Sequence, residues 1–72
     1  MSLINEKKDF SIISSLIPER SSVIDIGCND GSLLEYLEIN KKVDGRGMEI
    51  DQEKVQLCLS KGISVIEGDA DT

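Results

Sequence analysis

The feature that most limits the folds open to this chain is the stretch VIDIGCNDGSLL at positions 23–34. It passes from β-branched apolar residues, through Gly27 and Gly31, to leucines that begin a helical pattern. A buried strand, a tight glycine turn and a helix are therefore expected in this order. Because glycines let the backbone approach a ligand and a helix start offers free N–H groups, the turn is also a candidate site for a phosphate, a carboxylate or a nucleoside.

The spacing of apolar residues predicts that helices and strands alternate along the whole chain. The helices are expected at 10–17, from 32 to 39 and between Asp51 and Gly62, and the strands at 22–26, 45–50 and 63–66. Strands that alternate with helices of this length form a parallel sheet. The predicted fold class is α/β, and residues 1–72 are expected to be the N-terminal half of one Rossmann-like, three-layer αβα domain with strand order 3-2-1.

Capping residues predict where the helices begin and end. Ser32 and Glu35 fit the capping-box pattern, which would start the second helix directly after Gly31. Asp51 is suited to cap the third helix, and Gly62 stands where a helix C-terminal glycine belongs. The first helix is expected to have one apolar face and to end before the proline at position 18.

The strand at 22–26 presents a difficulty for a chain of 72 residues. Its apolar composition is typical of a strand buried on both faces, yet the order 3-2-1 leaves it at an edge. We expect one of two explanations for the exposed edge: the chain is the N-terminal piece of a longer domain, or a partner in a homo-oligomer covers this edge.

Composition excludes several classes of function. The formal net charge of −6, from 14 acidic and 8 basic residues, disfavours nucleic acid and anionic membranes as partners. The chain has no histidine and only 2 cysteines, Cys28 and Cys58, so histidine-assisted nucleophiles, zinc motifs and a disulfide framework are not expected. No apolar run is long enough for a membrane span, and a cytoplasmic location is expected.

The glycine spacing separates two kinds of cofactor site. The dinucleotide fingerprint G-x-G-x-x-G requires glycine at three positions, and here only Gly27 matches, because Asn29 and Ser32 occupy the others. The spacing G-x-G-x-G fits better, with Asn29 between Gly27 and Gly31. Asparagine adopts a positive φ more readily than other non-glycine residues, so the backbone path is expected to survive the exchange.

Two acidic residues accompany the turn. Asp25 is expected to brace the loop by accepting N–H bonds, or to approach an ammonium group of the ligand. Glu49 ends the second strand, where a carboxylate can accept hydrogen bonds from two ribose hydroxyls. Cys28 is expected to be a small packing residue rather than a nucleophile, and Cys58 a core residue.

The motifs VIDIGCNDG, GRGMEID and VIEGDAD resemble the first three sequence blocks of class I S-adenosylmethionine-dependent methyltransferases. The longer segment GMEIDQEKVQLCLSKGISVIEGDAD is similar to the MetW proteins of methionine biosynthesis, a branch of that fold. This resemblance implies that the glycine turn wraps the methionine part of S-adenosylmethionine. It also implies that Glu49 holds the ribose, that Ile50 and Ala70 contact the adenine and that Asp69 lies beside the adenine amine. The predicted cofactor-binding residues are Asp25, Gly27, Cys28, Asn29, Gly31, Glu49, Ile50, Asp69 and Ala70.

The resemblance leaves the activity open, because the fourth strand and the substrate site that follow in the family are absent and nothing identifies a catalytic residue. One hypothesis is that the protein is a methyltransferase. A non-catalytic partner of a homoserine acyltransferase is another, since MetW proteins act beside that enzyme. A nucleotide-dependent dehydrogenase or epimerase is disfavoured by Ser32. Asp69 and Asp71 also form a DxD pair, but two carboxylates without further ligands rarely hold a divalent cation, so no metal is expected.

Overall fold

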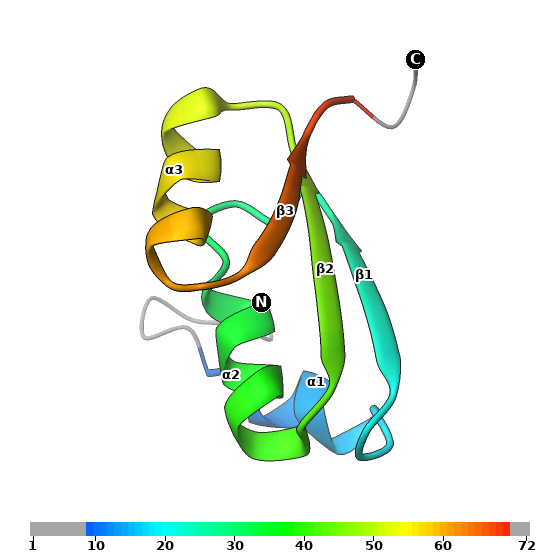
Figure 1. The fold of residues 1–72 in the computed structure, drawn as a ribbon. Helices are drawn as coiled ribbons and strands as arrows, with labels where there is room; N and C mark the ends of the chain where they lie inside the picture. The colour runs from blue at the N-terminus through cyan, green and yellow to red at the C-terminus, as the bar shows by residue number, and fades with distance from the viewer. Residues whose placement is uncertain (1–8, 70–72) are drawn as a thin grey trace, which may run out of the picture.

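A three-stranded parallel sheet is the frame of the molecule (Figure 1). The computed structural model describes residues 9–69, and the sheet order within them is β1-β2-β3. The elements in chain order are α1 (Ser11–Ser15), β1 (Ser22–Ile26), α2 (Ser32–Lys41), β2 (Asp44–Glu49), α3 (Gln52–Ser60) and β3 (Ser64–Glu67). The predicted α/β class, the parallel pairing and the position of the first strand at an edge are confirmed.

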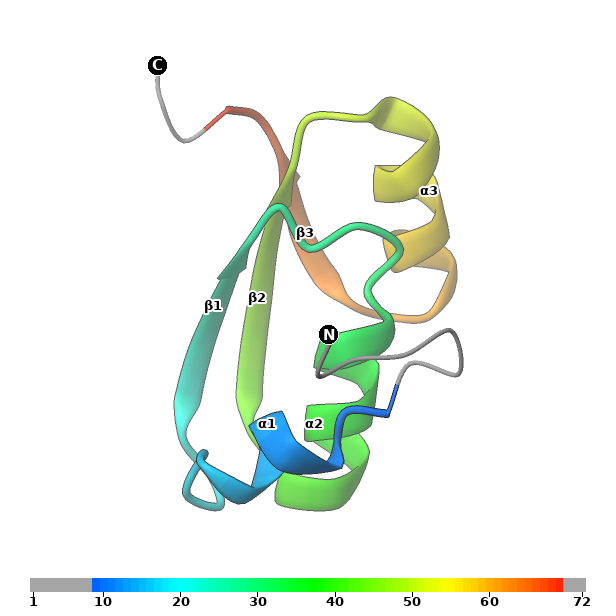
Figure 2. The ribbon, with the colours of Figure 1, turned by 180° about the vertical axis from the view of Figure 1, so that it is seen from behind.

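The core lies between the sheet and the two longer helices, α2 and α3, which cover the same side of it (Figures 1 and 2). Its buried cluster combines residues of the turn, of both helices and of the position just before β3, namely Cys28, Leu34, Cys58 and Ile63, with Val23 and Val65 packed against it. Gly47 of β2 leaves room for this cluster: a Cβ built there would lie 2.5 Å from the Cys28 Sγ. Glycine at this point of β2 therefore allows the sheet to approach the turn and Leu34 of α2 closely.

The opposite face of the sheet is open in the described part of the chain. The register pairs Ile26 with Met48 and Met48 with Ile66, so these side chains point to the same side. Ile24, Ile26 and Ile66 are 71%, 56% and 64% exposed. The prediction that strand 22–26 is buried on both faces is wrong for Ile24 and Ile26, because no described helix covers the second face.

Two of the three expected capping signals are confirmed. The Asp51 carboxylate accepts hydrogen bonds from the N–H groups of Glu53 and Lys54 at the start of α3. Gly62 follows that helix with φ +76°, and its N–H donates to the carbonyl of Leu59.

The prediction of a capping box at Ser32 is wrong. Gly31 is the N-cap residue of α2 and has φ +83°. Asp30 takes the role expected of Ser32, because its Oδ1 accepts hydrogen bonds from both the N–H and the hydroxyl of Ser32, at 3.0 and 2.7 Å. An aspartate before the N-cap thus satisfies the first free donor of the helix.

The other differences concern element ends. α1 covers five residues instead of the predicted 10–17, and Ile12 and Leu16 are exposed although an apolar face was expected. β2 and β3 are each shifted by one residue relative to the predicted strands 45–50 and 63–66.

Within residues 9–69, no helix has the length and apolar character needed to cross a membrane.

Candidate functional site

The turn between β1 and α2 has positive φ at three alternate positions. Gly27, Asn29 and Gly31 all have positive φ, at +72°, +59° and +83°. The prediction that Asn29 adopts the left-handed conformation is confirmed. The N–H groups of Gly27 and Cys28 both donate to the carbonyl of Met48, at 2.7 and 3.1 Å, which ties the start of the turn to β2.

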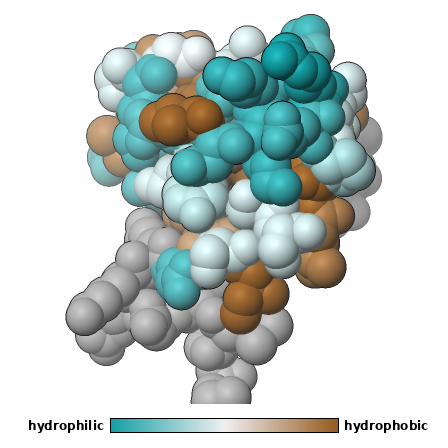
Figure 3. All heavy atoms as spheres, turned by 90° about the horizontal axis from the view of Figure 1, so that it is seen from below, coloured by the Kyte–Doolittle hydropathy of each residue, from teal (hydrophilic) through white to brown (hydrophobic). Residues whose placement is uncertain are grey.

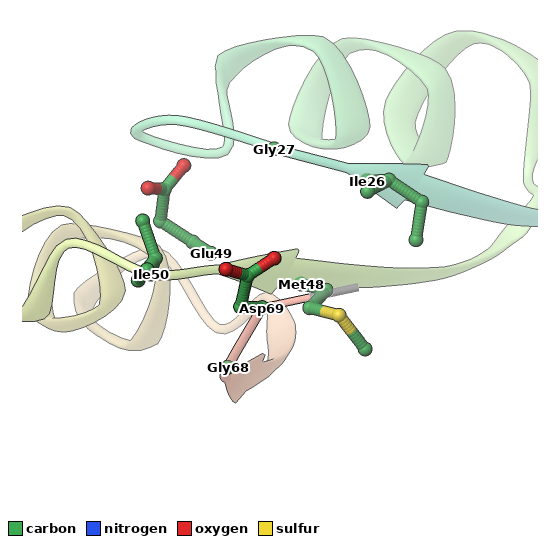
Figure 4. A pocket seen from close by; sticks show the side chains of 7 residues that line it. All are labelled: Ile26, Gly27, Met48, Glu49, Ile50, Gly68 and Asp69. Atoms are coloured by element: carbon green, nitrogen blue, oxygen red, sulfur yellow. The ribbon is translucent and has the colours of Figure 1, made fainter. Parts of the chain in front are cut away.

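Glu49, at the end of β2, stabilises the middle of the turn by hydrogen bonding. Its Oε1 accepts a hydrogen bond from the Asn29 N–H at 2.7 Å, and its Oε2 accepts one from the Asp51 N–H at 3.0 Å. Figure 4 shows this carboxylate on the side of the turn that follows Gly27. The Asp51 N–H and the Asn29 N–H hold the pKa of Glu49 below its ordinary value of 4.5. Because a carboxylate has about four lone-pair sites, Glu49 retains acceptor capacity for a ligand beside these N–H donors.

Asp25 differs from Glu49 in its surroundings. Its side chain is half-buried on β1, and no hydrogen bond to it is found within residues 9–69. Burial first, and then the nearby charge of Glu49, raise the pKa of Asp25 above its ordinary value of 3.8. The expected bracing of the loop by Asp25 is therefore not seen: Glu49 makes that contact. Asp25 retains its acceptor capacity.

We expect Asp25→Asn to raise the free energy of unfolding at pH 7 by about 0.5 kcal/mol, because it removes a partly desolvated charge beside Glu49 whose effect solvent screens in part. Since a raised pKa makes the folded chain bind its proton more tightly, ionisation of Asp25 costs stability as the pH rises from 3.8 through the raised value. The stability gained by Asp25→Asn should therefore be complete above the raised pKa of Asp25 and should disappear below pH 3.8. Urea unfolding from pH 7 to pH 3 measures it. Glu19→Gln, which neutralises an exposed carboxylate, is the control, and an equal gain in both variants would contradict the prediction.

Two hollows meet at Gly27. The first, of about 250 Å³, lies at the carboxyl ends of all three strands (Figure 4) and is lined by Ile26, Gly27, Met48, Glu49, Ile50, Gly68 and Asp69. The second, of about 290 Å³, lies beside the turn and is lined by Phe10, Asp25, Gly27, Cys28, Asn29, Asp30, Ser32 and Leu33. A Cβ built on Gly27 would meet no atom within 4 Å, so the absence of a side chain there leaves open space rather than relieving a core contact.

The predicted site residues come together at this end of the sheet, with two exceptions. Gly31 is buried instead of lining a hollow, and a Cβ there would lie 3.0 Å from the Cys58 Sγ. Ala70 lies outside the described residues. Asp69 is brought beside β2 by the hydrogen bond from the Gly68 N–H to the Glu49 carbonyl, at 3.0 Å. Cys28 lines the second hollow but is itself buried, as expected of a packing residue.

Sequence reasoning missed seven lining residues: Ile26, Met48 and Gly68 in the first hollow, and Phe10, Asp30, Ser32 and Leu33 in the second. Ile26 and Met48 enter the first hollow from the open face of the sheet, and their register across β1 and β2 is the signal that predicts their proximity. Phe10 borders the second hollow and packs edge to face against Tyr36, with ring centroids 5.8 Å apart. No local pattern in the sequence points to Phe10, because the contact depends on how α1 lies against α2.

Lys61 lies behind the turn and does not line either hollow. Its Nζ is 3.2 Å from the Ser32 hydroxyl and 3.6 Å from Asp30 Oδ2. This contact joins the end of α3 to the start of α2 and fixes the position of Asp30. The side-chain charges that line the two hollows are those of carboxylates, which favours a ligand with hydroxyl or ammonium donors.

The site has no metal-binding arrangement among residues 9–69, where no group of three or more histidine, cysteine, aspartate or glutamate side chains is placed to hold an ion.

The other end of the molecule, where the strands begin, is largely hydrophilic and has separate apolar side chains (Figure 3). Exposed residues in the segments there include Glu19, Arg20, Lys42 and Asp44.

Comparison with known proteins agrees with this geometry. A solved structure, a TehB-like SAM-dependent methyltransferase from Corynebacterium glutamicum, superposes with a TM-score of 0.73 at 21% sequence identity, and the match covers 82% of this chain and 33% of that one. This likeness shows the fold. A bifunctional methionine biosynthesis protein MetXA/MetW from Rhodopirellula baltica is 33% identical over an alignment of 69 residues, and the match covers 85% of this chain and 11% of the relative.

The chain thus spans a small part of the relatives that it matches. The family model for methionine biosynthesis protein MetW matches residues 7–72, which include the turn, all three strands and both hollows. This match covers nearly the whole chain, and the chain belongs to the MetW family.

Proposed function

We propose that the two hollows bind S-adenosylmethionine, with the nucleoside in the first and the methionine part in the second. The observation that carries this proposal is Glu49, a buried carboxylate at the end of β2 that retains acceptor capacity beside its N–H donors. Two adjacent ribose hydroxyls are a matching pair of donors. Gly27, which lines both hollows and has open space where a Cβ would be, allows the ligand to cross the turn against bare backbone.

The other contacts follow from the lining of the hollows. Ile50 is 65% exposed at the rim of the first hollow, where it provides an apolar surface for the adenine ring. Asp69 lines the same hollow and is suited to accept a hydrogen bond from the adenine amine; Ala70 follows it in the chain. In the second hollow, Asp25 is the acceptor for the ammonium group of the methionine part.

The contribution of these residues to a methyl transfer would be positioning. When bound, S-adenosylmethionine supplies an activated methyl group on its sulfonium. The turn, Glu49 and Asp25 fix both ends of the ligand, and alignment of this kind supplies much of the rate gain in a reaction between two bound groups. No residue of the two hollows is assigned as a base, and the acceptor would be bound by parts of the fold beyond this sheet.

Titration of the chain with S-adenosylhomocysteine, the demethylated product, tests the proposal. We expect saturable heat in isothermal calorimetry and competition by S-adenosylmethionine, but no heat with NAD, because Ser32 occupies the place of the third glycine in the dinucleotide pattern. Absence of heat with S-adenosylhomocysteine at millimolar concentration would reject the proposal.

A second function is favoured by the fusion of MetXA and MetW in the relative from Rhodopirellula baltica. We propose as this alternative that the protein acts in the cytoplasm as a non-catalytic partner of a homoserine acyltransferase. Fusion of two chains in one organism is consistent with contact between their separate counterparts in another. Co-purification of this protein with the acyltransferase of its own organism, together with no methyl transfer to any acceptor, would favour the alternative.

The open face and the free edge of β1 bear on both functions. A fourth strand against β1 would pair its edge, and a helix packed on the sheet would cover the open face. We propose that these elements come from further chain of the same domain or from a second copy.

A further inference from the structure

Two thiols face each other beneath the turn. Cys28 belongs to the turn and Cys58 to α3, and their Sγ atoms are 3.8 Å apart. Both are free and buried, with exposed fractions of 4% and 0%, and they are the 2 cysteines of the chain. Glycines make room for them: a Cβ on Gly47 would lie 2.5 Å from the Cys28 Sγ, and one on Gly31 would lie 3.0 Å from the Cys58 Sγ.

The thiol pair is connected to the ligand-binding carboxylate through Asn29. The Cys58 thiol donates a hydrogen bond to the Asn29 carbonyl, with 3.2 Å between sulfur and oxygen. The Asn29 N–H donates in turn to Glu49 Oε1 at 2.7 Å. The left-handed backbone of Asn29 is therefore held on one side by Cys58 and on the other by Glu49.

We propose that Cys28 and Cys58 are a redox-active pair whose reversible disulfide weakens ligand binding at the turn. With hydrogen peroxide as the two-electron oxidant, one thiol becomes a sulfenic acid and releases one water. The second thiol then attacks that sulfur, the S–S bond forms, and the hydroxyl leaves with the second thiol's proton as another water. Two thiols and one peroxide thus yield one disulfide and two waters, and a small dithiol reverses the reaction.

Disulfide formation acts on the turn in two ways. A disulfide has an S–S distance of about 2.05 Å, so the sulfurs must approach by about 1.8 Å, which displaces Cys28 and the turn that carries it. The bond also removes the Cys58 proton, so the Asn29 carbonyl loses its donor. Both changes reach Glu49 through the Asn29 N–H, and the part that concerns ligand affinity rests on the function proposed above.

The closed turn protects the pair. Burial, followed by the hydrogen bond that Cys28 makes with the Cys58 sulfur, raises the pKa of Cys28 to about 12. Because the thiolate is the reactive form, a closed turn oxidises slowly at neutral pH, and opening of the turn is needed for reaction. A ligand bound over the turn should therefore slow the oxidation.

The experiment oxidises the intact chain with hydrogen peroxide and follows its mass together with the NMR signals of the Asn29 amide and the Glu49 carboxyl. We expect the mass of the monomer to fall by two hydrogens, the Asn29 amide to shift and the pKa of Glu49 to rise, since it loses a donor. Dithiothreitol should reverse all three changes. In Cys58→Ala and Cys28→Ala, which cannot form the bond, the mass loss should be absent.

Two results would overturn the inference: oxidation that gives only sulfinic acid or linked dimers, and a disulfide that leaves the Asn29 and Glu49 signals in place. Affinity for S-adenosylhomocysteine should fall at least tenfold in the oxidised chain and recover on reduction. If the reduced chain does not bind this ligand, the proposed function fails, whereas the mass and the Glu49 titration still decide whether the thiol pair controls the turn.

Discussion

Gly47→Ala is expected to lower the free energy of unfolding by about 3 kcal/mol, the upper part of the range for overpacking a core. The new Cβ would lie 2.5 Å from the Cys28 Sγ, 3.0 Å from its Cβ and 3.2 Å from Leu34 Cδ1. Leu34 is fully buried and Cys28 nearly so, so neither side chain can move toward solvent. Since a domain this small has a stability of only several kcal/mol, the variant should be partly unfolded at 37 °C.

Urea unfolding followed by circular dichroism measures this loss. Gly68→Ala is the matched control, because a Cβ at that position meets no atom within 4 Å and its φ is not in the left-handed region. Cys28→Ala added to Gly47→Ala should recover part of the stability by removing the nearest atom. Equal unfolding midpoints for Gly47→Ala and Gly68→Ala would contradict the packing described for β2 against the turn.

Glu49→Gln is expected to weaken binding of S-adenosylhomocysteine by about 10- to 100-fold, the loss typical of a hydrogen-bonded charged group. A glutamine has one acceptor oxygen, whereas Glu49 accepts N–H donors from Asn29 and Asp51 on separate oxygens. Its amide nitrogen would face one of these donors and could not accept from a ribose hydroxyl. Glu67→Gln is the matched control, since Glu67 is the register partner of Glu49 on β3, is exposed and bonds only to Gln52 in the described chain.

The same substitution should change the pH dependence of stability. The pKa of Glu49 is lowered in the folded chain, so its contribution to stability is complete above 4.5 and is lost as the pH falls from there through the lowered value. Glu49→Gln should lack this acid-dependent loss. Urea midpoints measured from pH 6 to pH 3 compare the two chains, and parallel curves would show that the carboxylate does not hold the turn.

Local patterns predicted the parts of the fold that depend on neighbouring residues. The order of helices and strands, the left-handed Asn29 and the Asp51 cap each follow from a few consecutive positions, and the structure confirms them. The edge position of β1 also follows from general rules of parallel sheets. The predicted burial of Ile24 and Ile26 is wrong, because the burial of a sheet face depends on which other elements pack against it.

The site was predictable to a similar degree. Gly27 and Glu49 were expected together because parallel strands end at the same edge, and they line the same hollow. The hydrogen bond from Asn29 to Glu49 and the contact between Cys28 and Cys58 join positions 20 and 30 residues apart, and no short motif encodes them. Asp30, rather than Ser32, bonds the start of α2 because Gly31 reverses the chain immediately before it.

The position of Gly27 between two hollows has a consequence for selectivity. A ligand with two recognisable halves, joined by a linker narrow enough to pass over bare backbone, gains from both sites at once, because binding of the first half raises the local concentration of the second. Under the proposed function, adenosine and methionine offered separately would lack this gain. The turn would then select for the covalent connection between the halves as much as for the halves themselves, and a side chain at position 27 would lie in the path of that linker.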